Sequence, residues 1–188
     1  MLSGAELRPG LAVRLEHTLY RVIDATYHGG QGKMGGVMHA RLRNLETGTM
    51  TERNFRADET VQEVAPERQE LQFLYQDGSL TVFMDPKTFE QVEIESTRLG
   101  RAAPFLAEGM TIPVEFIDGR PVSIVFPDIV DVKVVETAPP AHAQGTSVWK
   151  QATLENGLKL LVPPFIAPGE TIRVHVERGE YVERAKRR

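Results

Sequence analysis

Lys33 is the residue of this chain whose neighbours most clearly suggest a chemical role. It lies in the stretch HGGQGKMGG, residues 28–36, which contains five glycines and one lysine. Glycines on both sides make a slim loop, which would let a cation enter a narrow anionic space such as a groove in RNA. With loop arms extended at roughly 3.3 Å per residue, the amine stands ~12 to 16 Å beyond the last strand hydrogen bond. The alternative is a lysine that is simply solvated, which is the commoner state of a polar residue at a loop tip.

The segments on either side of this loop are predicted to be β-strands. Residues 11–27, LAVRLEHTLYRVIDATY, carry apolar side chains in short runs, and residues 37–45, VMHARLRNL, alternate. The alternation places Met38, Ala40 and Leu42 on one face, so a long hairpin is expected with the glycine-rich loop at its tip. The opposite face carries Val37, His39, Arg41 and Arg43. The residues expected to support the tip are Gly30, Gly32, Met34, Gly35 and Gly36.

The loop resembles two phosphate-binding motifs but lacks parts that each of them requires. GQGKMG, residues 30–35, matches GxGxxG, but that fingerprint works only where a helix follows, and here a strand pattern follows. A P-loop fails because Tyr27 stands in place of its first glycine and Met34 in place of the Ser or Thr that binds magnesium. A small-molecule enzyme built on this loop would therefore need a helix after Gly36.

The other residues with catalytic or metal-binding side chains form no recognised motif. There is no cysteine, no GxSxG stretch and no HxH or HExxH pair. We therefore predict no metal, no cofactor and no enzymatic activity. The five histidines are His17, His28, His39, His142 and His175.

Composition and charge narrow the class of protein. The chain has 188 residues, 41% of them hydrophobic, with neither a signal-peptide h-region nor an apolar stretch of membrane length. Together with the lack of cysteine, this predicts a soluble cytoplasmic protein with no membrane contact. The net charge of −4 is concentrated in residues 66–128, where eleven Asp and Glu face five Lys and Arg. Any contact with RNA would therefore have to use local patches nearer the two ends, where residues 184–188, RAKRR, are the densest basic run. The alternative for such a run, and the commoner one, is a solvated tail.

Short strands punctuated by turns predict an all-β protein made of small barrels. Apolar, alternating runs of five to ten residues recur between turn signals, and residues 97–108 are the best candidate for a helix. A break is predicted at Pro66, and the predicted domains are residues 1–65, 66–128 and 129–188. The turn signals lie at Thr47-Gly48, Asp77-Gly78, Asp118-Gly119, Asn156-Gly157 and Arg178-Gly179.

Phe73 and Tyr75 are placed by simple alternation on one face of a strand. They could form an aromatic platform on which nucleic-acid bases stack, at roughly 1 to 3 kcal/mol per base. The alternative, which strand alternation favours, is that both fill the interior of a barrel. Trp149 follows a loop and by itself indicates neither role.

Four stretches, taken together in order and spacing, resemble bacterial elongation factor P along nearly the whole chain. They are GKMGG and ARLRNLETGT at 32–36 and 40–49, LQFLYQDGSLTVFMD at 71–85, ATLENGLKLLVPPFIAPGETIRV at 152–174, and GEYVERA at 179–185. The chain departs from the family pattern at Gln31, where proline is common, at Met34, where glycine is common, and at 141–146, AHAQGT, where the family often has GDT.

The resemblance implies an N-terminal SH3-like (KOW-type) barrel followed by two OB-fold barrels, arranged in an L. It implies a factor that binds both ribosomal subunits between the peptidyl and exit sites and relieves stalling at consecutive prolines. Lys33 would contact the CCA end of peptidyl-tRNA, either bare or lengthened by a lysine-modifying enzyme, and the protein would act as a monomer. The other residues that would contact ribosomal or transfer RNA are Arg41, Arg43, Tyr181 and Arg184.

A different class of function stays open beside this one. OB folds also form general binding modules for single-stranded nucleic acid, which use an aromatic groove and bind with salt-sensitive affinity.

Overall fold

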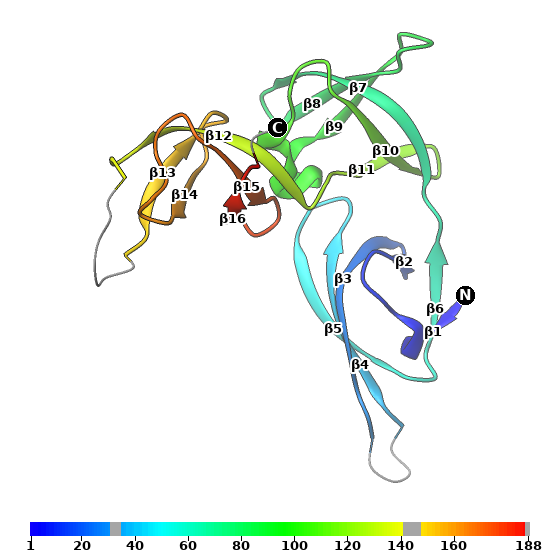
Figure 1. Ribbon diagram of the computed structural model, residues 1–188. Coiled ribbons are helices and arrows are strands. Elements are labelled where there is room, and N and C mark those ends of the chain that lie inside the picture. Colours follow the sequence, from blue (N-terminus) through cyan, green and yellow to red (C-terminus); the bar gives the residue numbers. More distant parts are fainter. Residues whose placement is uncertain (31–34, 141–147, 187–188) are drawn as a thin grey trace. The chain divides into compact units, whose positions relative to one another are not determined.

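The computed structural model describes residues 1–30, 35–140 and 148–186. These residues form three antiparallel sheets, at residues 2–64, 67–124 and 129–184 (Figure 1). The chain divides into two compact units: unit 1 comprises residues 1–99 and 108–125, and unit 2 comprises residues 100–107 and 126–188. Within the described residues, no helix is long and apolar enough to cross a membrane. The prediction of an all-β fold is confirmed.

The first sheet has six strands in the order β1-β6-β2-β3-β4-β5. Its core is built from apolar side chains of β2 to β6, with Val22, Leu42 and Phe55 fully buried. The elements are β1 (Leu2–Ser3), the 3-10 turn η1 (Gly4–Glu6), β2 (Ala12–Leu15), β3 (Thr18–His28), β4 (Val37–Asn44), β5 (Met50–Arg56) and β6 (Thr60–Val64).

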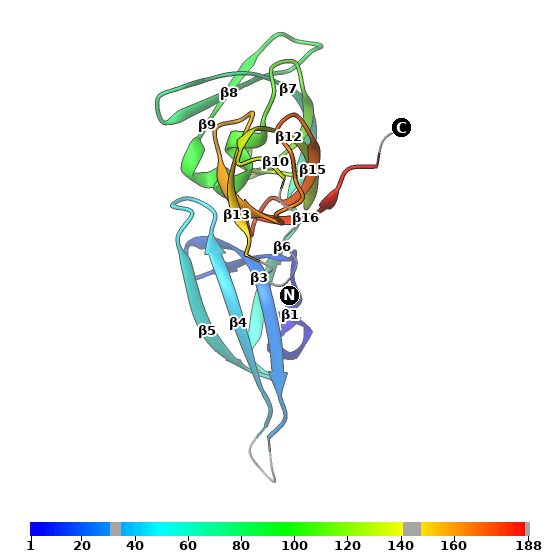
Figure 2. The ribbon, with the colours of Figure 1, turned by 60° about the vertical axis from the view of Figure 1, so that its left-hand side comes forward.

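The β3–β4 hairpin is the predicted hairpin around the glycine-rich loop. Its register runs from Tyr20 opposite Asn44 to His28 opposite Val37, with one irregularity after Val22. Met38, Ala40 and Leu42 are buried as predicted, because every second residue of β4 faces the core. In two views the hairpin runs past the other strands of its sheet (Figures 1 and 2).

The second and third sheets share one topology. The second has the order β11-β10-β7-β8-β9 and the third has β14-β13-β12-β15-β16, so each begins with a central strand and ends at an edge. In each sheet the two edge strands also approach one another, β9 with β11 and β14 with β16. This closes each sheet into a five-stranded Greek-key barrel, which is the OB fold.

The strands of these two barrels are short, as the spacing of turn signals predicts. In the second sheet they are β7 (Glu67–Asp77), β8 (Leu80–Met84), β9 (Gln91–Glu95), β10 (Thr111–Ile117) and β11 (Arg120–Ile124). In the third they are β12 (Ile129–Thr137), β13 (Lys150–Leu154), β14 (Lys159–Val162), β15 (Thr171–His175) and β16 (Glu180–Arg184). The hairpin turns predicted at the Asp-Gly, Asn-Gly and Arg-Gly pairs are confirmed, and their glycines have the positive φ that such turns require.

The predicted helix at 97–108 is present as the 3-10 segment η2 (Ser96–Phe105). It is two short turns rather than one helix, because Gly100 interrupts it with φ 59° and ψ −135°. The division between the two units falls here, between Leu99 and Gly100. Within unit 2, Arg101 Nη1 donates a hydrogen bond to the carbonyl oxygen of Arg178 at 3.1 Å.

The expectation that Phe73 and Tyr75 share a face is wrong. The register of β7 against β8 shifts between them, so the alternation is broken at this point. Phe73 is buried and packs edge-on against Phe83, whereas the side chain of Tyr75 is exposed. The two rings therefore form neither a common platform nor a common core layer.

Unit 1 joins the first two sheets through one buried carboxylate and an apolar cluster. Glu115 of β10 is 3% exposed and accepts hydrogen bonds from Arg21 of β3, from Arg68 of β7 and from the Ser123 hydroxyl. The nitrogen–oxygen distance is 3.1 Å for Arg68 Nη2, and the oxygen–oxygen distance for Ser123 is 2.6 Å. Because Arg21 belongs to β3, this network links the hairpin strand directly to the second barrel. The apolar cluster beside it comprises Ala12, Leu19, Leu45, Ile117 and Val122.

Candidate functional site

The candidate site is the end of the β3–β4 hairpin. The last strand pair is His28 with Val37, and Gly30 and Gly35 are exposed beyond it. Gly36 is different, because it is buried, its carbonyl oxygen accepts a hydrogen bond from Ala57 N at 3.0 Å, and the ring of Tyr27 lies against it. Lys33, Gly32 and Met34 lie outside the described residues, so their predicted roles stay predictions.

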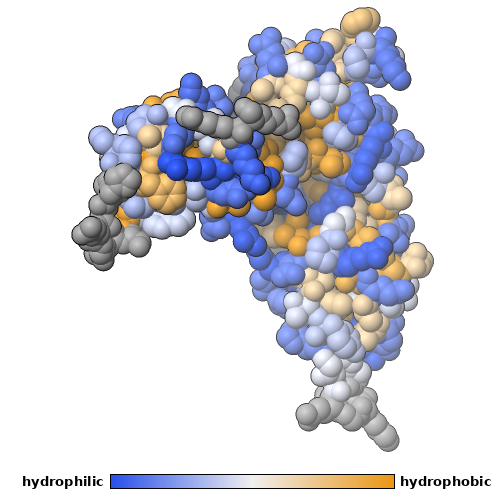
Figure 3. Space-filling view, viewed as in Figure 1, coloured by the Kyte–Doolittle hydropathy of each residue, from blue (hydrophilic) through white to orange (hydrophobic). Residues whose placement is uncertain are grey.

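The hairpin end carries almost no charge of its own. In the sequence, Lys33 is the only Asp, Glu, Lys or Arg between Asp24 and Arg41. Figure 3 shows the described end of the hairpin, next to the grey residues, mostly in white and pale colours, so this surface is neither strongly hydrophilic nor strongly hydrophobic. The nearest charged side chains on a neighbouring segment are Arg56 and Asp58, which flank Ala57 beside Gly36 and lie 3.2 Å from one another.

Arg41 and Arg43 lie on β4, on the face opposite its buried residues. Arg41 is half exposed, and its Nε lies 3.9 Å from a carboxylate oxygen of Glu52, which is directly opposite on β5. Glu52 also lies 3.6 Å from His39 Nε2. To contact an anion such as an RNA phosphate, Arg41 would have to leave the exposed carboxylate of Glu52. This exchange would cost little free energy, because exposed ion pairs contribute about 0 to 1 kcal/mol.

Tyr181 and Arg184 lie together on β16 of unit 2. The Tyr181 ring packs edge-on against Trp149, with ring centroids 5.8 Å apart and planes at 85°. Partial burial raises the pKa of the Tyr181 hydroxyl above its ordinary value, although the nearby Arg184 charge opposes this. Tyr181 is therefore a neutral hydrogen-bonding group at neutral pH, beside the only tryptophan of the chain.

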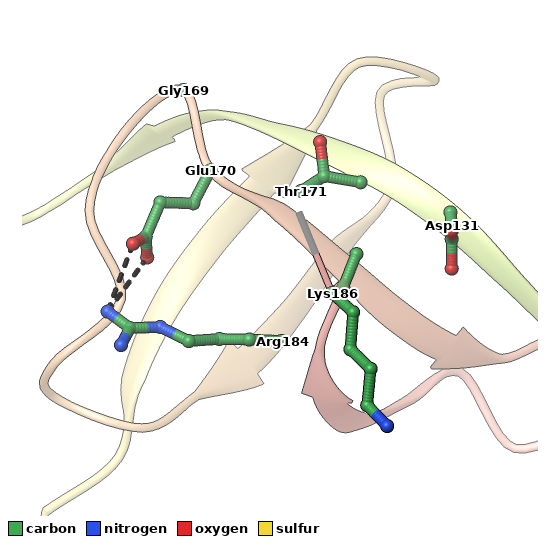
Figure 4. A pocket seen from close by; sticks show the side chains of 7 residues that line it. Asp131, Gly169, Glu170, Thr171, Arg184 and Lys186 are labelled. Atoms are coloured by element: carbon green, nitrogen blue, oxygen red, sulfur yellow. Dashed lines mark hydrogen bonds and ion pairs between the residues drawn. The ribbon is translucent and has the colours of Figure 1, made fainter. Parts of the chain in front are cut away.

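Arg184 borders an open depression of about 700 Å³ on the third sheet. Its Nη2 lies 3.0 Å from a carboxylate oxygen of Glu170, and its guanidinium stacks over the ring of Phe165 at 4.9 Å from the centroid. Figure 4 shows Arg184 and Glu170 facing one another, with the Lys186 side chain extending away from them. This corner of unit 2 thus combines aromatic faces with two cations, of which Arg184 is held in a fixed orientation.

The predicted site residues fall into two groups. The structure brings Gly30, Gly35 and Gly36 together at the hairpin end, with Arg41 and Arg43 on its stem, all in unit 1. Tyr181 and Arg184 form the second group, in unit 2. The stretch at 141–146, where the chain departs from the family pattern, lies outside the described residues. Among the described residues there is no group of three His, Cys, Asp or Glu that could hold a metal ion.

Sequence reasoning missed three aromatic residues that complete these two groups: Tyr27, Trp149 and Phe165. Tyr27 had a usable signal, since it is the last aromatic side chain before the glycines and glycine leaves space beside a ring. Trp149 and Phe165 had none, because their partners Tyr181 and Arg184 come from another strand of the barrel, β16.

Models of the elongation factor P family match the chain in three consecutive parts. The KOW-like domain matches residues 3–61, the OB domain residues 66–124 and the C-terminal domain residues 130–184. The first sheet is therefore a KOW-like domain, and it is followed by OB domains. The exact domain limits predicted from the sequence stay a prediction.

Curated proteins named elongation factor P are similar over their full length. The protein from Coprothermobacter proteolyticus is 41% identical over 187 residues, covering 98% of this chain and 99% of its own. Those from Clostridium kluyveri and Erythrobacter litoralis are 39% and 38% identical over 185 residues, covering 98% of this chain and 100% and 98% of their own. A solved structure of eukaryotic translation initiation factor 5A from Methanococcus jannaschii aligns with 66% of this chain and 92% of its own, at 16% identity and a TM-score of 0.49.

Proposed function

Because this chain belongs to the elongation factor P family of translation elongation factors, we propose that it binds the ribosome between the peptidyl and exit sites and stimulates peptide-bond formation at consecutive prolines. In this proposal the β3–β4 hairpin carries Lys33 toward the CCA end of peptidyl-tRNA in the peptidyl site. The factor works in the cytoplasm as a monomer, without a cofactor and without chemistry of its own.

The observation that carries this proposal is the strand that begins at Val37, directly after the glycines. A dinucleotide site or a P-loop places a helix at this point, so the alternative of a small-molecule enzyme built on GQGKMG is wrong. A hairpin that carries a single lysine beyond its last strand pair instead suits a probe that reaches a partner lying past the end of the barrel.

The physical mechanism proposed for Lys33 is positioning. An ammonium group beside the phosphates and sugars of the CCA end attracts them without reading sequence. Holding a peptidyl-tRNA in a reactive orientation removes part of the entropic barrier to reaction, and well-oriented groups can gain several powers of ten in rate. The ribosome performs the bond formation. A β-lysyl or similar extension on Lys33, added by a lysine-modifying enzyme, would lengthen the same probe.

The third sheet is proposed to face the small subunit. Tyr181 and Arg184, with Arg41 and Arg43 in unit 1, are the proposed contacts with ribosomal or transfer RNA. Arginine guanidinium groups bind phosphate oxygens in a bidentate manner, and a neutral tyrosine donates a hydrogen bond to them. These contacts hold the protein on the ribosome independently of the sequence being translated.

A second candidate, a general binding module for single-stranded nucleic acid, rests on the Trp149–Tyr181 pair. Both rings are partly exposed and could stack on bases. Since Trp149 is the only tryptophan, its fluorescence reports this site alone. Titration with an unstructured oligonucleotide at low and high salt measures this activity, and salt-sensitive quenching at micromolar concentrations would favour it.

In-vitro translation of a reporter with three consecutive prolines tests the first candidate. We expect the wild type to relieve the pause, Lys33→Arg to retain part of the effect because the charge remains, and Lys33→Ala to lose most of it. A reporter without prolines is the control and should respond to none of the three. Equal relief by the wild type and Lys33→Ala would refute the role given to Lys33.

A further inference from the structure

Tyr27 and Gly36 make an unusual contact at the root of the glycine-rich loop. Tyr27 is on β3 and pairs with Met38 across the hairpin, so its ring reaches past the last strand pair to Gly36. A methyl group built on Gly36 would overlap the hydroxyl and Cζ of Tyr27 and would lie 2.6 Å from its Cε2. No side chain larger than hydrogen fits at position 36 while the ring stays where it is.

The same glycine is fixed from its other side. Its carbonyl oxygen accepts the 3.0 Å hydrogen bond from Ala57, which follows β5, and the next residue, Val37, pairs with Arg56. Gly36 is thus enclosed by β5 on one side and by the Tyr27 ring on the other, which explains why it is buried although it lies at the hairpin end.

We propose that Tyr27 is a positioning residue for Lys33, and that its ring clamps the two legs of the hairpin together at Gly36. This proposal rests on the function proposed for Lys33, which in the sequence lies six residues after Tyr27 and three before Gly36. The clamp adds a cross-hairpin contact beyond the last hydrogen-bonded pair, so it fixes the point at which the chain enters β4. With Gly36 held in place, only two residues of the sequence separate a fixed point from Lys33, which lowers the entropy lost when the lysine reaches its target.

Tyr27 meets Gly36 with the outer end of its side chain, both the hydroxyl oxygen and the ring carbons Cζ and Cε2, so the contact is one of packing rather than of a hydrogen bond. Among the described residues the Tyr27 hydroxyl has no hydrogen-bond partner. Tyr27 is also 52% exposed, so it contributes little to the core of its domain. Its removal should therefore leave folding intact, and phenylalanine should replace it.

The two sides of the contact can be perturbed separately. Tyr27→Ala removes the ring, while Gly36→Ala keeps the ring but displaces it, because the exposed end of a tyrosine can swing into solvent. Both should reduce the maximal rate of Pro-Pro bond formation by roughly 3- to 10-fold, which is less than the ~100-fold that a misplacement of about 1 Å can cost, because the hydrogen bond from Ala57 still holds Gly36. The factor concentration that gives half-maximal rate should stay the same, because ribosome contacts elsewhere are unchanged. The variant that carries both substitutions should be no slower than either single variant, because each substitution removes the same Tyr27–Gly36 contact.

Two variants complete the design. Tyr27→Phe should keep the wild-type rate, and Tyr75→Ala, which removes a tyrosine of nearly equal exposure from the second barrel, should also keep it. The clamp is checked without ribosomes by the NMR shift of the Gly36 α-protons, which the Tyr27 ring should perturb in the wild type and in Tyr27→Phe but not in Tyr27→Ala.

Lys33→Ala, measured in parallel, separates failure of this proposal from failure of the proposed function. A large loss with Lys33→Ala but a wild-type maximal rate with Tyr27→Ala would overturn the clamp alone. An unperturbed Gly36 shift in the wild type would also overturn it. Full activity of Lys33→Ala would instead overturn the function on which the clamp rests.

Discussion

Replacing Glu115 by glutamine should destabilise unit 1 by about 3 kcal/mol. Glutamine keeps the size of the side chain but loses the charge, and its amide nitrogen cannot accept the hydrogen bonds that the carboxylate oxygens accept. The Arg21 side chain is only 16% exposed, so the change leaves a nearly buried guanidinium without its counter-charge. Breaking a buried pair in this way costs about 3 to 5 kcal/mol. The lower end applies because Arg21 keeps hydrogen bonds to the Gly10 carbonyl at 2.9 Å and to Ser123 at 3.2 Å.

The second arginine of this network provides the matched control. The Arg68 side chain is 61% exposed although it binds the same carboxylate, so Arg68→Gln should cost only about 0 to 1 kcal/mol. Both variants are measured by thermal and urea unfolding, following the transition that includes unit 1. For Glu115→Gln the midpoint should fall by about 10 °C, and the urea dependence of the unfolding free energy should be unchanged.

A double variant sharpens this test. When Arg21→Met is added to Glu115→Gln, the unpaired guanidinium is gone, so the double variant should be more stable than Glu115→Gln alone. The reasoning is refuted if Glu115→Gln costs no more than Arg68→Gln, or if adding Arg21→Met lowers the stability further.

Two further predictions concern other parts of the chain. Gly48 has φ 73°, and a Cβ there would lie 2.5 Å from the Thr97 carbonyl oxygen, so Gly48→Ala should lower the stability of unit 1 by about 1 to 3 kcal/mol. Gly78 has a similar φ but open space around it, so Gly78→Ala should lower the unfolding free energy by less in the same experiment. Equal losses of stability in the two variants would contradict the close approach of position 48 to the Thr97 carbonyl. For Tyr181, burial raises the pKa, so the stabilisation it contributes is fully present below the ordinary tyrosine pKa of about 10 and is lost as the pH rises through its folded-state pKa. Tyrosinate absorbance should show one step above pH ~10, and this step should disappear in Tyr181→Phe. If the step that Tyr181→Phe removes lies at or below pH ~10, the assignment is contradicted.

Local rules predicted much of this fold from the sequence. Alternation in residues 37–45 identified the buried face of β4, and glycine after Asp or Asn identified hairpin turns in both OB barrels. These features depend on neighbours in the chain, which is why a single sequence contains them. The family resemblance supplied what local rules could not, namely which barrel is KOW-like and which are OB folds.

The features that the sequence did not reveal depend on distant partners or on irregular geometry. Tyr75 is exposed because the register of β7 against β8 shifts after Phe73, and no residue in this stretch of the sequence indicates such a shift. Glu115 looks like a strand carboxylate that should face water, but it is buried because Arg21, 94 residues away in the chain, meets it. The burial of Gly36 likewise depends on a ring from the opposite strand.

The most direct test of the central claim is the rate of a single Pro-Pro peptide bond on purified ribosomes at saturating factor. The factor should raise this rate by a power of ten or more, as expected for catalysis by orientation, and Lys33→Ala should lose most of that gain while still binding the ribosome. A rate that is the same with the wild type and with bound Lys33→Ala would contradict the claim that this lysine acts as the probe.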